Sequence, residues 1–137
     1  MWAVFALFSA LFAAITSILI KIGVENINSN LATAIRTVVV LIMAWAVVFV
    51  TGAQGGIEGI SRRNLLFLVL SGIATGVSWL CYNRALQLGP ASRVIPIDKS
   101  SVVFGMILAF IILKETLTLR AAIGGVLIAI GTFVLIF

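Results

Sequence analysis

Five long apolar runs, almost free of charged residues, decide what this chain can fold into. They cover approximately residues 2–21, 31–51, 64–88, 93–113 and 118–137. Each run has about the 20 residues that an α-helix needs to cross the hydrocarbon core of a bilayer. A helix also satisfies its own backbone hydrogen bonds, which lipid requires of any spanning segment. The sequence therefore predicts an all-α integral membrane protein with five transmembrane helices.

The composition excludes a water-soluble globular fold. Of the 137 residues, 63% are hydrophobic and 9% are charged, whereas soluble domains carry roughly 25% charged residues. A chain of this size cannot hide that much apolar surface from water. Five spans of about 20 residues also leave only short connections. We therefore expect a single transmembrane domain over residues 1–137, in contact with membrane lipid.

Two of the five runs allow an alternative interpretation. The first run resembles a signal peptide in its apolar character, but it lacks a basic region at its start, so we expect it to be retained. The fourth run carries Pro96, Asp98 and Lys99 near its beginning. Four full spans and one re-entrant segment therefore remain the alternative to five spans.

The net charge of +5 does not indicate a nucleic-acid partner. Most of the nine Lys and Arg residues stand at the ends of the apolar runs, where basic residues set membrane topology. In the five-span topology, one side receives Arg62, Arg63, Lys114 and Arg120, and the other receives Lys21, Arg36, Arg84, Arg93 and Lys99. This balance gives almost no orientation signal, so insertion in both orientations is an open alternative to a single topology.

The residue types that usually carry catalysis or metal binding are scarce. The chain has no His, one Cys and four Asp or Glu residues, and the acids are dispersed along the sequence. Cys81 stands alone within an apolar run, so no disulfide framework can form within the chain. We therefore expect no enzyme activity, no metal site and no cofactor.

Small residues recur at helical spacing in the third and fifth runs. In membranes such residues allow helices to approach closely. Two interpretations stay open, packing within one chain or contact between subunits. The candidate packing or dimer-contact residues are Gly72, Gly76, Ala121, Gly125 and Ala129.

Ionisable and polar residues inside the spans are the candidate substrate-binding residues. Charged residues within a membrane are costly and usually face a cavity or a partner. The alternatives are that Arg36 and Arg84 extend to the interface, or that Asp98 only pairs with one of them to tether two helices. The candidates are Arg36, Trp79, Tyr82, Asn83, Arg84, Asp98 and Lys99.

The charge of this group indicates the kind of substrate. Three cations against Asp98 would leave a positive pocket, which favours an anionic or zwitterionic group over a cation. Asp98 is the only acid within a span, and its cationic neighbours make exchange of a cation against a proton an unfavourable interpretation. Pro96 removes a backbone hydrogen bond, so we expect a kinked or broken helix beside the site, as in many transporters.

Several motifs together resemble one EamA-type repeat of the drug/metabolite transporter superfamily, and the resemblance covers essentially the whole chain. The stretch from Pro96 to Lys99 is similar to half-size members in particular. The motifs are Arg36, the segment Tyr82-Asn83-Arg84-Ala85-Leu86-Gln87-Leu88-Gly89-Pro90-Ala91-Ser92, Pro96, the segment Leu113-Lys114-Glu115-Thr116-Leu117 and the glycines of the last run.

The resemblance implies a transporter whose usual form has ten helices in two inverted repeats. A single five-helix repeat can recover that arrangement only as a dimer of opposed subunits. We therefore expect a bacterial or archaeal inner-membrane transporter subunit that moves a small metabolite by alternating access as an antiparallel homodimer, with a parallel homodimer as an alternative. The alternative is an accessory or assembly subunit that packs against another membrane protein and transports nothing.

Overall fold

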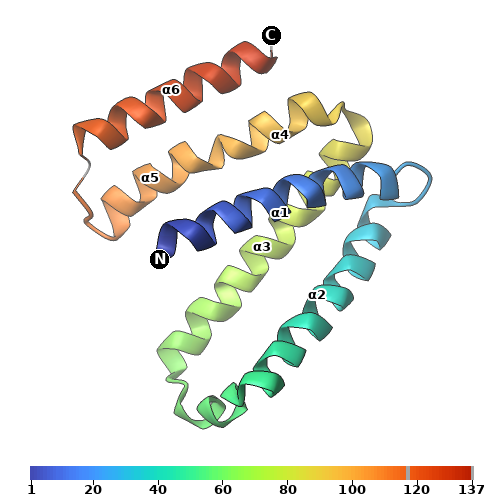
Figure 1. Cartoon of the computed structure of the whole chain (residues 1–137), viewed down its shortest axis with the longest axis vertical. Coiled ribbons are helices and arrows are strands. Elements are labelled where there is room, and N and C mark those ends of the chain that lie inside the picture. Colours follow the sequence, from blue (N-terminus) through green and yellow to red (C-terminus); the bar gives the residue numbers. More distant parts are fainter. Residues whose placement is uncertain (117, 137) are drawn as a thin grey trace. The chain divides into compact units, whose positions relative to one another are not determined.

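The computed structural model describes residues 1–116 and 118–136, and these residues form helices and short connections without a strand (Figure 1). Leu117, in the expected last turn, and Phe137, at the expected end of the last span, lie outside the described residues. The elements are α1 (Trp2–Gly23), α2 (Ser29–Thr51), the 3-10 helix η1 (Ala53–Gly59), α3 (Arg62–Leu88), α4 (Ala91–Lys99), α5 (Ser101–Ile112) and α6 (Leu119–Ile136).

The prediction of five membrane spans is confirmed. Five stretches of the described chain are long and apolar enough to cross a bilayer, with α4 and α5 together forming the fourth, Ala91–Ile112. The observed helix ends differ from the predicted ones by a few residues. The largest consequence is at α3, which begins at Arg62, so that Arg62 and Arg63 stand in its first turn and not in the preceding connection.

Polar side chains at the helix starts explain several of these boundaries. The Asn28 side chain accepts a hydrogen bond from the Asn30 backbone N–H at 2.8 Å. The Ser61 hydroxyl accepts one from Asn64 at 3.1 Å, and the Thr118 hydroxyl accepts one from Ala121 at 3.2 Å. Each satisfies a backbone donor that has no partner within its helix.

The fourth span is interrupted at Ser100, four residues beyond the proline that the sequence singled out. The Ser100 backbone N–H donates to the Ile97 carbonyl at 3.0 Å, and its hydroxyl donates to the same carbonyl at 2.6 Å. These bonds reach back three residues and tighten the helix there. Pro96 lies inside α4 and lacks the N–H that would bond to the preceding turn. The expected broken helix is therefore present, with its break between α4 and α5.

The chain divides into two compact units, residues 1–18 with 88–137 and residues 19–87. In the first unit, α6 packs along α4 and α5 (Figure 1). Gly125 of α6 is buried, and a Cβ atom at this position would lie 3.3 Å from the Met106 Cε atom of α5. The small residue therefore lets α6 approach α5 closely.

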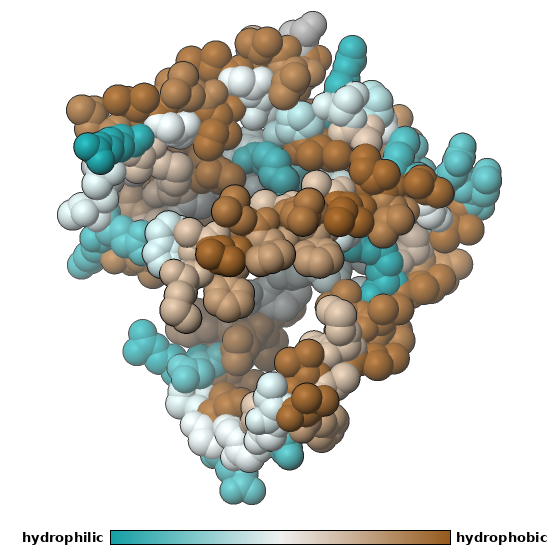
Figure 2. Space-filling model, viewed as in Figure 1, coloured by the Kyte–Doolittle hydropathy of each residue, from teal (hydrophilic) through white to brown (hydrophobic). Residues whose placement is uncertain are grey.

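In the second unit, the buried apolar side chains gather where α1 ends, α2 begins and α3 ends. These side chains are Ile20, Val24, Ala32 and Leu86. Most other apolar side chains of α2 and α3 are exposed, and apolar residues cover much of the face seen in Figure 2. For a membrane protein this exposed surface is the surface that meets lipid or another helix.

The close contact at Gly125 gives a prediction about stability. We expect Gly125→Leu to lower the free energy of unfolding by about 1–3 kcal/mol, because the added side chain collides with Met106 and forces α5 and α6 apart. The measurement is reversible unfolding of the purified protein in detergent micelles, followed by circular dichroism. Gly124→Leu is the matched control, since a Cβ there meets nothing within 4 Å. Equal losses for the two variants would contradict this packing.

Candidate functional site

Three of the predicted site residues meet in the second unit, around the Arg36 guanidinium. Arg36 lies in the third turn of α2, while Trp79 and Asn83 lie one turn apart near the end of α3. Arg36 donates a hydrogen bond from Nη1 to the Asn83 Oδ1 atom at 3.2 Å. Its guanidinium carbon lies 5.4 Å from the centre of the Trp79 ring, within the range of a cation–π interaction.

The Asn83 amide also bonds to a second residue of α2, Thr33. Its Nδ2 atom donates to the Thr33 hydroxyl oxygen at 2.6 Å, and the Thr33 hydroxyl donates to the Ser29 carbonyl at 2.8 Å. Asn83 is 0% exposed and Thr33 is 6% exposed. Both polar side chains are therefore buried with partners, as burial of polar groups requires.

Arg36 has no acidic partner among the described residues, and its one side-chain hydrogen bond there is the bond to Asn83. The guanidinium is half-buried and carries five N–H donors. A cation within a membrane span that is oriented but not neutralised can receive an anion. Binding of an anion is therefore the main chemistry that this site can perform.

The remaining predicted residues of α3, Tyr82 and Arg84, are the neighbours of Asn83 in the chain. Tyr82, next to Asn83 in the chain, is half-buried. Arg84 is exposed and donates from Nη1 to the Gln87 Oε1 atom at 2.7 Å. The structure therefore gives Arg84 a partner on its own helix, one turn further along.

Gln87 links the end of α3 to the connection between α1 and α2. Its Nε2 atom donates to the Val24 carbonyl at 3.1 Å and to the Ile27 carbonyl at 2.8 Å. Lys21 donates to the Leu86 carbonyl at 2.7 Å, which places a cation at the negative end of the α3 dipole. The Gln87 bonds hold the α1–α2 connection, and the Lys21 bond holds the last turn of α1, against the end of α3.

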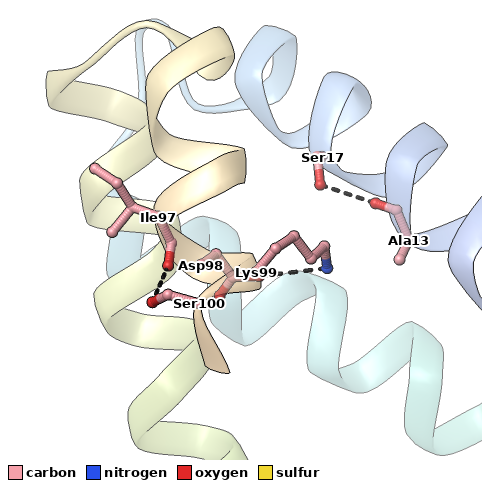
Figure 3. Close-up of polar contacts among 6 residues, drawn as sticks. All are labelled: Ala13, Ser17, Ile97, Asp98, Lys99 and Ser100. Carbon is pink, nitrogen blue, oxygen red and sulfur yellow. Dashed lines mark hydrogen bonds and ion pairs between the residues drawn. The ribbon is translucent and has the colours of Figure 1, made fainter. Parts of the chain in front are cut away.

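Asp98 and Lys99 belong to the first unit, at the end of α4. The Lys99 amine lies 3.4 Å from the Asp98 Oδ2 atom (Figure 3). The side chains are 53% exposed for Lys99 and 34% exposed for Asp98, so solvent weakens the pair. Figure 3 also shows the Ser17 hydroxyl bonded back to the Ala13 carbonyl on α1, at 2.8 Å.

The predicted packing residues have different surroundings. Gly125 packs against Met106 of the same chain, whereas a Cβ atom added at Gly72 or Gly76 of α3 would meet nothing within 4 Å. In α6, Ala121 is half-buried and Ala129 is exposed. Among the described residues, no group of three or more His, Cys, Asp or Glu side chains lies together.

The residue that sequence reasoning missed is Thr33. Its hydroxyl lies in an apolar helix, where a threonine usually bonds to its own backbone, and nothing nearby indicated a second partner. The available signal was the spacing of Ser29, Thr33 and Thr37, which stand four residues apart and so share one face of α2.

The similarity of the chain to known proteins shows its family. The EamA-like transporter family matches residues 1–137. The chain belongs to this family. The resemblance seen in the sequence is therefore confirmed, and the protein is an integral membrane protein of a transporter family.

Relatives of this EamA-like chain are similarly short. A protein of Sinorhizobium sp., named as an uncharacterized transporter in the cobO 3′ region, is 48% identical over 134 residues, which are 98% of this chain and 95% of that protein. An uncharacterized protein of Methanocaldococcus jannaschii is 35% identical over 74 residues, 54% of each chain. No solved structure matches.

The contacts of Arg84 in this EamA-like chain predict energetic coupling to Gln87. Arg84→Met and Gln87→Leu should each destabilise the fold, but their effects should not add, because either change breaks the same bond. Because the bond is exposed and joins residues three apart on one helix, we expect a coupling energy of about 0.5 kcal/mol in a double-mutant cycle of unfolding in micelles. Arg93→Met with Gln87→Leu is the matched control, and a coupling as large in that pair would contradict the role of this bond.

Proposed function

We propose that this protein is a transporter subunit that moves a small anionic or zwitterionic metabolite by alternating access as a homodimer, with no enzyme activity of its own. Membership of a transporter family and a relative named as a transporter support the general activity. The observation that carries the choice of substrate is the Arg36 guanidinium, oriented by Asn83 and Trp79 and without an acidic partner among the described residues.

The binding chemistry follows from the guanidinium geometry. Arginine forms two parallel hydrogen bonds with a carboxylate or phosphate, and such charge-assisted bonds are about twice as strong as neutral ones. Membrane insertion of a bare charge costs about 2.5–3.5 kcal/mol on insertion scales. A bound anion neutralises Arg36 and offsets part of this cost, so the substrate and the site stabilise each other within the membrane.

The number of spans supports a dimer of opposed subunits. Alternating access in many transporters depends on two repeats of inverted topology. Five spans make one such repeat here, and the similar Sinorhizobium protein, of which this chain covers 95%, has about the same length. A second copy in the opposite orientation would supply the inverted repeat. The balance of Lys and Arg on the two sides permits both orientations, and we place this dimer in a bacterial or archaeal inner membrane.

The second candidate function is that of an accessory subunit of another membrane protein. The observation in its favour is the exposed face of α3, where Gly72 and Gly76 have open space around them. Small residues of this kind let another transmembrane helix approach. The same face of α3 could also form the contact in a homodimer of this chain. The two candidate functions are therefore distinguished by whether the purified chain, without another protein, transports a solute.

Transport by the purified chain tests the proposal. Proteoliposomes containing this chain alone should take up a labelled compound from a panel of amino acids, organic acids and nucleotide sugars. Arg36→Gln should reduce uptake at least about tenfold, because a hydrogen bond to a charged group contributes about 1.5–3 kcal/mol. Arg36→Lys should retain part of the activity, since it keeps the charge and loses the planar fork. Arg93→Gln, on an exposed cation, should leave uptake unchanged.

Two results would contradict the transporter proposal. One is wild-type protein that inserts correctly and takes up no compound of the panel while another membrane protein co-purifies with it, which would favour an accessory subunit. The other is undiminished uptake by Arg36→Gln, which would remove Arg36 from substrate binding.

The opposed orientation of the subunits has its own test. We expect C-terminal fusions to alkaline phosphatase, active outside the cytoplasm, and to green fluorescent protein, fluorescent inside it, both to show activity. The reason is that nearly balanced basic residues give the chain no preferred orientation. Activity of only one reporter would contradict the antiparallel dimer and favour a parallel one.

A further inference from the structure

The direction in which Asn83 presents its amide depends on Thr33. The Thr33 hydroxyl donates its proton to the Ser29 carbonyl at 2.8 Å, so its oxygen is left as an acceptor. That oxygen receives the Asn83 Nδ2 atom at 2.6 Å. An amide has a donor end and an acceptor end, and occupation of the donor end by Thr33 leaves the Oδ1 atom to face Arg36.

Burial makes this dependence strict. Asn83 is 0% exposed, Thr33 is 6% exposed and Ser29 is 4% exposed, so bulk water does not replace a lost bond between them. A reversed amide would point its donors at the donors of the guanidinium and would leave the Thr33 oxygen without its bond. Buried groups of this kind are costly when unsatisfied. The network therefore has one favourable orientation.

The same orientation leaves part of the guanidinium available. Trp79 covers one face at 5.4 Å, and Asn83 occupies a donor at Nη1. The Nε and Nη2 atoms make no hydrogen bond among the described residues. These two atoms lie on one edge of the planar group, and a carboxylate matches such an edge with two parallel hydrogen bonds.

We propose that Thr33 is a positioning residue for substrate: through the Asn83 amide it fixes the Arg36 guanidinium so that its free edge binds a carboxylate. This inference rests on the proposed anion-binding function. It adds that the anion is a carboxylate and that Thr33 fixes the orientation of the guanidinium that binds it. Among the described residues no hydrogen bond joins Thr33 to Arg36, and in this proposal Thr33 acts on the guanidinium through Asn83.

Thr37 provides the matched control. It lies one turn further along α2, and its hydroxyl donates to the Thr33 carbonyl at 2.8 Å in the same geometry that Thr33 uses toward Ser29. The side chain is exposed, and Asn83 does not bond to it. Thr37→Val therefore removes the same hydroxyl and the same type of backbone bond, without touching the Arg36 network.

The test uses the full chain in phosphatidylcholine vesicles, sodium acetate as the carboxylate probe and phenylglyoxal as the arginine reagent. The rate of Arg36 modification is followed by mass spectrometry, with sodium chloride at equal ionic strength as the control salt. In the wild type, acetate should slow Arg36 modification and chloride should not. In Thr33→Val, the acetate concentration that gives half protection should rise at least about tenfold, because the edge is no longer held.

Rescue and control variants separate positioning from general damage. Thr33→Ser keeps the hydroxyl and should restore protection to within about twofold of the wild type, and Thr37→Val should match the wild type. If Thr33→Val does not fold, Thr33→Cys supplies the comparison, since a thiol is only a weak hydrogen-bonding group. Its half-protection concentration should also rise above that of the wild type.

Each remaining outcome has a distinct meaning. Equal protection in the wild type and in both Thr33→Val and Thr33→Cys would overturn the inference and leave the proposed function standing. Failure of Thr33→Ser to restore protection would also overturn it, because side-chain volume and not the hydroxyl would then matter. Absence of acetate protection in the wild type would contradict the proposed anion site itself, and the inference would fall with it.

Discussion

The central physical constraint on this site is the charge of the Arg36 guanidinium, which lies within a membrane span. A cation there is expensive, and no acid among the described residues pairs with Arg36. The chain instead surrounds the cation with weaker partners, an amide oxygen at 3.2 Å and an aromatic face at 5.4 Å. These contacts orient the guanidinium without neutralising it. In the proposed function an anionic substrate completes the neutralisation, which would link the stability of the site to transport.

The position of this group follows from the packing around it. The buried side chains of the second unit gather at the end where α2 begins and α3 ends. At the same end, Gln87 bonds to the α1–α2 connection and Lys21 bonds from the last turn of α1 to α3. The Arg36 network therefore stands on the best-packed part of this unit. The exposed remainder of α2 and α3 is the surface that meets lipid or another helix.

The sequence predicted the parts of this arrangement that arise from composition and helical periodicity. The five spans follow from hydropathy, and Arg36, Trp79 and Asn83 follow from the rarity of such residues within lipid. Thr33 escaped prediction because its second partner is 50 residues away in the chain. The Gln87 partner of Arg84 was not predicted either, because a basic residue near a helix end is usually assigned to the interface. The helix breaks at Ser100 and not at Pro96, because the Ser100 backbone N–H and hydroxyl both bond to the Ile97 carbonyl. The spacing of residues in the sequence does not predict these bonds.

Direct observation of an anion at Arg36 tests the proposed anion site most sharply. Solid-state nuclear magnetic resonance on the chain in lipid, with ¹⁵N-labelled arginine and acetate labelled with ¹³C at the carboxyl group, reports their proximity by dipolar coupling. We expect coupling between the acetate carbon and the guanidinium nitrogens of Arg36, and no coupling in Arg36→Gln. A folded wild-type protein that shows no such coupling, or the same coupling in Arg36→Gln, would contradict the proposed anion site.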